Sequence, residues 1–425
     1  MQPGWLPELS RDGWLLFVTC GVRNFAYGFL SVMLGLYLAA LGLEVGAIGA
    51  LFTAALVGSA VMTVTVTAVA DRLGRRRLLI AGAGLMALAG AVFALTDSPI
   101  LLTSAAILGV ISPSGKEVGP FLSIEQVVLS QATSDEQRTS VFAVYNLVGS
   151  LAGALGALAA GLPTVLGLAP LAGYRVLVWS YAAAGLALLS LFARLSLRVE
   201  ARPSVSARPQ HWLGVQRSRG TVTKLAALFA FDAFAGGFVV QGLVAYWFHL
   251  RYGIETATLG TIFFGANLLS ALSYLAAAPT AKRIGLLNTM VFTHLPSNVL
   301  LLLVPFMPSL TLAVTMLLAR HLLSQLDLPT RQSYTMAVVD ADERSAAAGI
   351  TAVARNTAAA VAPAFAGATL ARPELGLPFL FAGALKIVYD VAILLVFRHL
   401  RPPEETARTA AVPSASPRRP VIHSR

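Results

Sequence analysis

Long apolar runs, broken by short polar or Gly/Pro segments, dominate this chain of 425 residues. Each run is long enough to cross the roughly 30 Å core of a bilayer as a helix of about 20 residues. Twelve such runs fall at about 14–40, 45–70, 77–96, 100–131, 139–161, 174–196, 223–248, 257–281, 286–306, 310–338, 345–370 and 377–398. The pattern predicts an all-α membrane protein with twelve transmembrane helices.

A basic, Pro-containing segment divides the twelve runs into two sets of six. The predicted organisation is an N-terminal six-helix bundle at 1–196, a linker at 197–222, a C-terminal six-helix bundle at 223–398 and a disordered tail at 399–425. The first run is too long for a cleaved signal peptide and is expected to remain as the first span. We expect both termini, the linker and the tail on the cytoplasmic side of an inner or plasma membrane, because the basic residues are concentrated there.

The composition agrees with a membrane protein and argues against nucleic-acid binding. Hydrophobic residues make up 56% and charged residues only 12%, whereas soluble domains carry roughly a quarter charged residues. The net charge of +11 comes largely from Lys and Arg in segments predicted to be cytoplasmic, as the positive-inside rule expects. Cys20 is the only cysteine, which excludes an intrachain disulfide.

The two halves contain similar fragments in the same order, offset by about 210 residues. The matching fragments are FAYGF (25–29) with FAGGF (234–238), LGLEVGAIG (41–49) with YGIETATLG (252–260), ADRLG (70–74) with AKRIG (281–285), and DEQR (135–138) with ADER (341–344). The order and nearly constant offset indicate duplication of a six-helix unit.

The loop between the second and third spans, ADRLGRRRLL at 70–79, resembles the loop signature of the major facilitator superfamily, in particular its proton-coupled drug and solute efflux branch. The resemblance implies the major facilitator fold, with two pseudo-symmetric six-helix bundles. It also implies a conformational latch against the start of span eleven, near Ser345, formed by Asp71, Arg72, Gly74, Arg75 and Arg76. Alternatively, the arginines only anchor the loop in the cytoplasm.

Several polar or charged side chains fall inside the apolar runs. A charge at the centre of a bilayer costs about 2.5–3.5 kcal/mol even on the insertion scale, so it must face a cavity or a partner. The predicted residues of a substrate or coupling cavity are Arg23, Tyr27, Lys116, Glu117, Glu125, Asp232, Arg320, Asp327, Arg331 and Arg355.

The internal repeat suggests how these charges pair. It aligns Arg23 with Asp232 and Glu125 with Arg331, which are residues of opposite sign. We therefore expect two ion pairs between the halves, Arg23 with Asp232 and Glu125 with Arg331. In the last span, Lys386 and Asp390 lie one helical turn apart and are expected to pair with each other. His294 and His321 are expected to be structural.

The fourth span contains ISPSGKEVGPFLSIEQ at 111–126, in which Pro and Gly loosen the helix. Such a break survives at membrane depth only where it is buried in protein or lines a watery cavity, and it gives Lys116 and Glu117 access to one. Alternatively, both side chains neutralise partners on neighbouring helices without a ligand. The candidates for carrying a coupling proton are Asp232, Glu125 and Glu117, in that order, with structural ion pairing as the alternative.

No motif for nucleotide binding, metal binding or hydrolysis is present, so we expect neither an enzyme nor a cofactor. The prediction is a monomeric secondary transporter that moves a small solute by alternating access, with proton-coupled efflux as its leading version. Span five carries Gly149, Gly153 and Gly156, which resemble the family's antiporter signature in part or serve close packing. Two alternatives are uptake or facilitated passage of an anionic solute, and a sensor or lipid-handling protein without turnover.

Overall fold

The computed structural model describes residues 9–117, 119–132, 135–200, 215–340 and 343–400, without the side chains of residues 71, 131–140 and 345. The helices of the N-terminal half are α1 (Arg11–Ala40), α2 (Val45–Leu73), α3 (Arg75–Leu95), α4 (Pro99–Leu108), α5 (Phe121–Ala132), α6 (Asp135–Ala159), α7 (Leu162–Val165) and α8 (Pro170–Phe192). Those of the C-terminal half are α9 (Arg219–Gly237), α10 (Gln241–Tyr252), α11 (Thr256–Ile284), α12 (Leu286–Leu303), α13 (Leu310–Ser324), α14 (Asp327–Val338), α15 (Arg344–Thr369) and α16 (Leu377–Phe397).

These helices follow the predicted spans closely. Within the described residues, nine helical stretches are long and apolar enough to cross a membrane. The other three predicted spans are α4 with α5, α13 with α14, and α15. The seventh span is also divided, because α9 and α10 are separated by residues 238–240. The predicted C-terminal tail at 399–425 lies outside the described residues, apart from residues 399 and 400.

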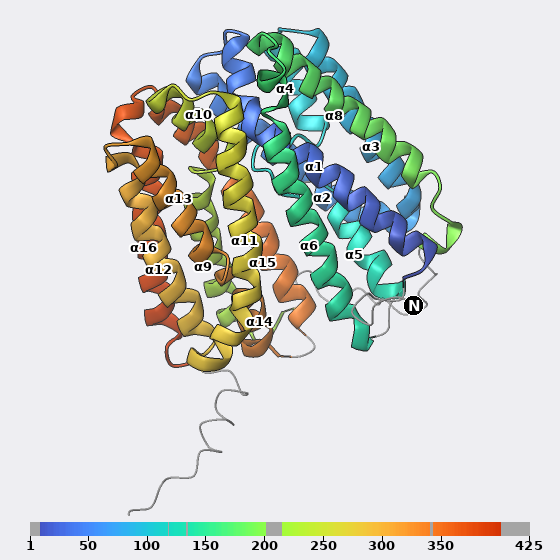
Figure 1. Cartoon of the computed structure of the whole chain (residues 1–425). Coiled ribbons are helices and arrows are strands. Elements are labelled where there is room, and N and C mark those ends of the chain that lie inside the picture. Colours follow the sequence, from blue (N-terminus) through green and yellow to red (C-terminus); the bar gives the residue numbers. More distant parts are fainter. Residues whose placement is uncertain (1–8, 118, 133–134, 201–214, 341–342, 401–425) are drawn as a thin grey trace, which may run out of the picture.

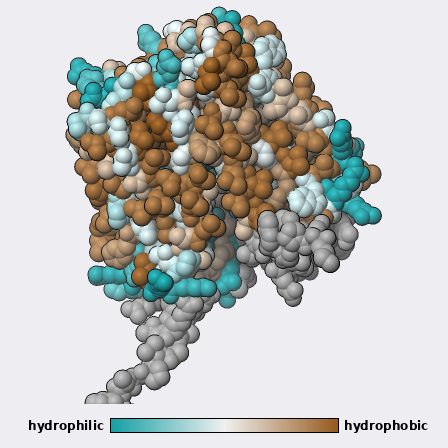
Figure 2. All heavy atoms as spheres, viewed as in Figure 1, coloured by the Kyte–Doolittle hydropathy of each residue, from teal (hydrophilic) through white to brown (hydrophobic). Residues whose placement is uncertain are grey.

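Figure 1 shows two helical bundles, one built from α1 to α8 and the other from α9 to α16. The bundles lie close together at the end where α4 and α10 are labelled and spread apart towards the end from which the C-terminal tail leaves. Apolar side chains cover most of the lateral surface in the view of Figure 2. This is the surface that a helix bundle needs in order to face lipid.

Small residues allow the bundles to touch at the end opposite the linker. Gly49 on α2 and Gly367 on α15 meet so closely that a Cβ atom on Gly49 would lie 2.7 Å from the Cα atom of Gly367. A Cβ atom on Gly260 of α11 would lie 2.7 Å from the carbonyl oxygen of Ala157 on α6. Glycines at such contacts let helix backbones approach within van der Waals distance.

Hydrogen bonds between the bundles lie at the same end. Gln241 donates its side-chain amide to the Ser31 hydroxyl at 2.8 Å, and the backbone N–H of Gly242 donates to the Pro113 carbonyl at 2.9 Å. At the end that carries the linker, by contrast, the bond from Arg75 to Glu200 and the bond from Gln216 to Glu343 each stay within one half of the chain. Together with the spread of the bundles in Figure 1, these contacts describe an arrangement that is closed at the end opposite the linker.

Glu343 ties the start of α15 to the start of α9. Its carboxylate accepts the backbone N–H groups of Gln216 at 2.6 Å, Arg217 at 2.9 Å and Ser218 at 2.9 Å. These bonds favour the ionised form, led by the one from Gln216, and lower the pKa of Glu343 from its usual 4.5 to about 2.

This lowered pKa predicts a pH-dependent contribution of Glu343 to stability. A group with a depressed folded-state pKa stabilises the protein above its usual pKa, and the contribution disappears as the pH falls through the folded value. Glu343→Gln is therefore expected to lower the melting temperature near neutral pH, and this difference should shrink as the pH falls from 4.5 towards 2. Melting of both proteins across this range checks it; a difference that grows on acidification contradicts it.

Candidate substrate and coupling site

A break in the fourth span brings charged side chains to membrane depth. The helix α4 ends at Leu108, and α5 begins at Phe121. Between them, Gly115 and Gly119 adopt positive φ angles of 67° and 79°, and Val110 does so at 58°. A β-branched residue in this region is strained, and such strain concentrates at functional sites. The predicted break is present, and Lys116 and Glu117 lie in it.

Arg23 on α1 lies at the centre of the first charge cluster. Its guanidinium is fully buried and contacts Glu117 at 2.8 Å and Glu125 at 2.7 Å. The Glu125 side chain is also fully buried, whereas the Glu117 side chain is 16% exposed. Two carboxylates thus share one guanidinium.

Further donors complete this Arg23 cluster. Thr19 donates to Glu125 at 3.1 Å, Asn24 donates to Glu117 at 2.6 Å, and the Tyr145 hydroxyl donates to Glu125. The Arg23 guanidinium also lies over the ring of Phe121, 4.9 Å from its centroid. Each carboxylate oxygen of the cluster has a hydrogen-bond donor, as burial of charge requires.

Asp232 on α9 lies at the centre of the second cluster, in the C-terminal bundle. Its carboxylate contacts the Lys386 ammonium at 2.5 Å and the Arg331 guanidinium at 3.1 Å. Arg331 also contacts Asp327 at 3.3 Å, one helical turn earlier on α14. Two carboxylates and two cations therefore form this Asp232 cluster.

The expected pairs between the halves, Arg23 with Asp232 and Glu125 with Arg331, are wrong. The same four residues pair within each bundle, Arg23 with Glu125 and Asp232 with Arg331. Within each bundle, the charged side chains of the first and fourth spans reach each other at the same depth. The duplication is preserved, because the pair in one bundle occupies the equivalent positions of the pair in the other with the signs exchanged.

The expected pair of Lys386 with Asp390 is also wrong. Lys386 bonds to Asp232, while Asp390 accepts hydrogen bonds at 2.8 Å from His294 and at 2.8 Å from Asn298 on α12. Residues one helical turn apart share a face only approximately, and here the two side chains reach different neighbouring helices. His294 has the buried partner expected of a structural histidine.

Three of the predicted cations have no carboxylate partner among the residues that the structure describes. In the described part of the chain, no ion pair or side-chain hydrogen bond is formed by the charged groups of Lys116, Arg320 or Arg355. Lys116 is exposed, whereas Arg320 and Arg355 are half-buried. Tyr27 is fully buried, and among the described residues its hydroxyl has no hydrogen-bond partner. The structure therefore places Tyr27 inside the bundle rather than on an open surface.

The predicted latch can be followed only in part. The side chains of Asp71 and Ser345 lie outside the described residues, and Arg72 is exposed. The backbone N–H of Arg75 donates to the Glu200 carboxylate at 2.7 Å, and Arg76 donates to the Ala193 carbonyl. Gly74 has a φ of 95°, and a Cβ atom there would lie 3.1 Å from the Glu200 carboxylate. These contacts join the loop to the end of the sixth span.

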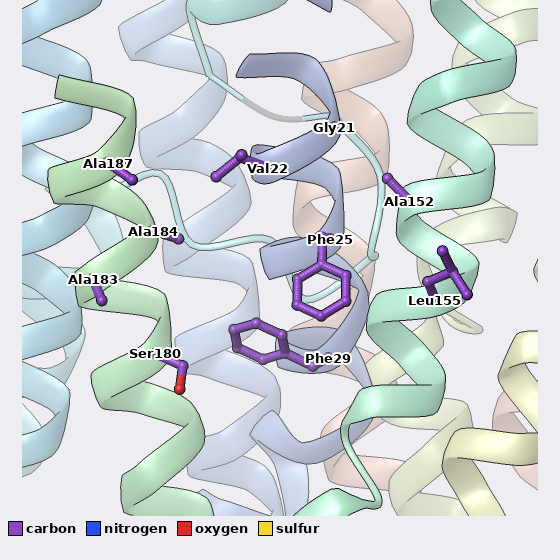
Figure 3. Close-up of a pocket in the computed structure, with 10 residues that line it drawn as sticks. All are labelled: Gly21, Val22, Phe25, Phe29, Ala152, Leu155, Ser180, Ala183, Ala184 and Ala187. Carbon is purple, nitrogen blue, oxygen red and sulfur yellow. The ribbon is translucent and has the colours of Figure 1, made fainter. Parts of the chain in front are cut away.

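An apolar groove of about 550 Å³ lies between α6 and α8, with α1 behind it (Figure 3). Its lining includes Gly21, Phe25 and Phe29 of α1, Leu155 of α6, and Ser180 and Ala184 of α8. No lining side chain is charged. The groove belongs to one bundle and contains none of the predicted site residues.

Two helical bundles with divided helices and buried charge clusters define a multi-pass membrane transporter of the secondary type. A family model described as Major Facilitator Superfamily matches residues 16–325. The chain belongs to this family, whose members are transporters and not enzymes. The predicted twelve-span fold is confirmed by the family match and by the solved structures that it resembles.

The chain is similar to proteins of several kinds. It is 27% identical to the "Uncharacterized membrane protein YJR124C" of Saccharomyces cerevisiae, over 91% of this chain and 94% of that protein. Among solved structures it resembles the nucleoside transporter NupG, with a TM-score of 0.71 and 14% identity over 92% of this chain and all of that one. It also resembles the human organic anion transporter MFSD10, with a TM-score of 0.62 and 18% identity over 91% and 100% of the two chains.

Several members of the charge clusters were not predicted. Thr19, Asn24 and Tyr145 complete the Arg23 cluster, and Lys386 belongs to the Asp232 cluster. Asn24 could have been noted because it follows Arg23 directly. Lys386 could have been included on its charge alone, since a cation in an apolar run needs an anion. Thr19 and Tyr145 carry no such signal, because hydroxyl side chains are common in transmembrane helices.

Proposed function

We propose that this chain exchanges a small solute for protons by alternating access, and that the Arg23 cluster carries the proton. Membership of the family supports a secondary transporter but leaves the solute, the direction and the coupling ion open. The similar structures include a D-xylose-proton symporter, with a TM-score of 0.70 and 15% identity over 90% and 96% of the chains. Because the similar transporters are named for different solutes, the proposal rests on this chain's own charges.

The balance of charge in the Arg23 cluster carries the proposal. Two carboxylates, Glu117 and Glu125, share one guanidinium. When both are ionised the cluster has one negative charge in excess, and binding a proton leaves a neutral pair. Uptake and release of one proton therefore never leave a buried cation without an anion, which is the state that costs most.

The Asp232 cluster is less suited to this role. Asp232 and Asp327 already balance Lys386 and Arg331. A proton on either carboxylate would leave a buried cation uncompensated. The charge balance thus favours Glu117 or Glu125 over Asp232, which reverses the order expected from the sequence.

Between the two glutamates, access to water favours Glu117. Its side chain is 16% exposed, whereas that of Glu125 is fully buried. Glu117 also lies in the break of the fourth span, next to Lys116, while Glu125 lies within α5. We assign proton exchange to Glu117 and a constant structural charge to Glu125.

The closed end opposite the linker supports alternating access. If the linker is cytoplasmic, the present arrangement opens towards the cytoplasm, and the loop at 70–79 would close that side in the opposite state. In this proposal Asp71, Arg72, Gly74, Arg75 and Arg76 form the latch of that state. Exchange for protons that enter the cell would drive the solute outwards.

Proton movement in proteoliposomes tests the proposal. The purified full-length protein is reconstituted with trapped pyranine, and members of a solute library are added on one side. At least one solute is expected to change the lumenal pH in the wild type. In Glu117→Gln this change should fall at least about tenfold, because a permanently neutral side chain removes the proton site. Solute-for-solute counterflow should persist in this variant, since Gln resembles the protonated carboxyl.

Glu374→Gln is the matched control, because Glu374 is exposed on the loop before α16. It should move protons like the wild type. Solute flux that moves no protons in the wild type contradicts proton coupling. Solute binding without any flux supports instead the alternative of a sensor that does not transport.

A further inference from the structure

The apolar groove of Figure 3 opens to the surface of the N-terminal bundle. Small residues of α6 and α8, among them Ala152 and Ala184, form its walls, and the rings of Phe25 and Phe29 on α1 lie between them. The two rings pack edge to face, with their centroids 5.8 Å apart. Phe25 is 39% exposed and Leu155 is 53% exposed. In a bilayer, an open apolar groove of this kind faces lipid.

The groove offers no free polar side chain. Of the lining residues labelled in Figure 3, only Ser180 has a polar side chain. Its hydroxyl donates to the Val176 carbonyl of its own helix at 2.9 Å. Sites for polar small molecules contain a few placed polar groups that fix the orientation of the ligand. The lining therefore suits an alkyl chain rather than a polar solute.

An exposed apolar stripe leads from the groove to the start of α1. Trp14, Val18, Gly21 and Phe25 follow one another at spacings of four, three and four residues, which places them on one face of the helix. Trp14 is 39% exposed and Val18 is 49% exposed. Tryptophan is enriched where membrane and water meet. The stripe thus connects the groove with the membrane surface on the linker side.

Exposed cations lie at the same end of α1 and α8. The Asp12 carboxylate accepts the backbone N–H of Ser196 at 3.0 Å, which joins the start of α1 to the segment after α8. Arg11 directly precedes Asp12, and Arg194 lies two residues before Ser196; both are exposed. Within the described ranges, neither guanidinium has an ion-pair partner. Both are therefore available to an anion from outside the chain.

The distances match those within one lipid molecule. At 1.5 Å per residue of helix, the groove begins about 10 Å from Arg194, at Ala187, and extends to about 21 Å from it, at Ser180. Half of the hydrocarbon core of a bilayer is about 15 Å thick. An acyl chain of a lipid whose phosphate lies at Arg194 therefore ends within the groove.

We propose that Arg11 and Arg194 bind the phosphate of an anionic phospholipid from the leaflet on the linker side, and that one acyl chain of this lipid lies in the groove. A guanidinium donates two parallel hydrogen bonds to phosphate oxygens, and the buried methylene groups of the chain add hydrophobic stabilisation. The bound lipid joins α1, α6 and α8 and stabilises the N-terminal bundle. This site is separate from the Arg23 cluster and does not depend on the proposed proton exchange.

Native mass spectrometry of the delipidated full-length protein tests the proposal. The probes are dioleoyl-phosphatidylglycerol, dioleoyl-phosphatidylcholine, which has the same chains on a zwitterionic headgroup, and glycerol phosphate, which has no acyl chain. Phosphatidylglycerol is expected to bind saturably and at least about tenfold more tightly than phosphatidylcholine, because cations near the membrane surface attract anionic lipid. It should also raise the melting temperature. Glycerol phosphate should not bind measurably.

Charge variants test the headgroup site. In the double variant Arg11→Gln with Arg194→Gln, the preference for phosphatidylglycerol over phosphatidylcholine should disappear, while the binding of phosphatidylcholine stays unchanged. The matched control is Lys282→Gln with Arg283→Gln, which removes two exposed cations at the end of α11. This control should keep the preference of the wild type.

A variant that fills the groove tests the chain site. Ala184→Trp should weaken the binding of both phospholipids at least about tenfold, because the chain loses the burial of several methylene groups. Ala184→Leu fills less of the groove and should have a smaller effect in the same direction. Ala81→Trp is the matched control, because Ala81 is exposed on α3, outside the groove. It should bind both lipids like the wild type. Melting without added lipid shows that each variant is folded.

Several outcomes overturn the proposal. Equal affinity of the wild type for the two phospholipids, or an equal loss of preference in the Lys282 and Arg283 control, would show that Arg11 and Arg194 do not recognise the headgroup. Unchanged lipid binding in both Ala184 variants, or equal weakening by Ala81→Trp, would show that the groove does not hold the chain. Binding of glycerol phosphate as tight as that of phosphatidylglycerol would assign the cations to a free phosphate compound instead.

Discussion

Arg23→Gln is expected to destabilise the protein by about 3–5 kcal/mol, because it removes one partner of a buried ion pair and leaves the others uncompensated. Arg23 is fully buried between Glu117 and Glu125. Without the guanidinium, two neighbouring carboxylates would repel each other away from water. The measurement is the melting temperature in detergent, together with the yield of monodisperse protein.

Neutralising variants identify the partners of Arg23. Adding Glu117→Gln and Glu125→Gln to Arg23→Gln removes all three charges, and most of the lost stability should return, because a neutral polar group is less costly to bury than an unpaired charge. Adding Asp232→Asn instead should bring no recovery, since Asp232 pairs with Lys386 and Arg331. If Asp232→Asn recovers the lost stability and the two Glu→Gln substitutions do not, the result would show that Arg23 pairs with Asp232 between the bundles, contrary to the structure.

Gly367→Val is expected to open the end that is closed in this structure. A Cβ atom on Gly367 would lie 2.7 Å from the Cα atom of Gly49 and 3.0 Å from the carbonyl oxygen of Val45, all of them backbone contacts that cannot rotate away. Such overpacking costs about 1–3 kcal/mol. If this cost falls only on the arrangement in which this end is closed, the equilibrium shifts roughly 5- to 150-fold towards the arrangement in which it is open.

Cysteine labelling measures this opening. Ser31, which is buried where the bundles meet, is replaced by cysteine in a Cys20→Ser background, and a water-soluble maleimide is added. Gly367→Val should label several-fold faster than the parent. Gly46→Val is the matched control, because Gly46 lies on α2 close to Gly49 but a Cβ atom there would have open space around it to 4 Å. Equal labelling of the two variants, with both still folded, would show that the glycine contact does not hold this end closed.

Pairing within each bundle has a consequence for transport. The pairs of Arg23 with Glu125 and Asp232 with Arg331 each belong to one bundle, so they persist when the bundles rock against each other as rigid bodies. Pairs between the bundles would have to break and re-form in every cycle.

The apolar pattern determined most of the fold. Each predicted span corresponds to a helix or to a divided helix, because a segment in lipid must satisfy its backbone hydrogen bonds within itself and its length is set by the bilayer. Pro113, Gly115 and Pro120 indicated where the fourth span is broken. The charges at membrane depth were visible as exceptions to an apolar run, so the sequence identified most of the residues of the two charge clusters.

Only the tertiary structure decided which of these residues meet. The repeat relates Arg23 to Asp232, but equivalence by symmetry does not place two side chains in contact, and Arg23 instead pairs with Glu125. Lys386 contacts Asp232 on another helix and not Asp390, its neighbour one turn along its own helix. Helical periodicity determines the direction of a side chain from its own helix, whereas its partner depends on how neighbouring helices pack and at what depth. That information is distributed over the whole bundle, and no local pattern contains it.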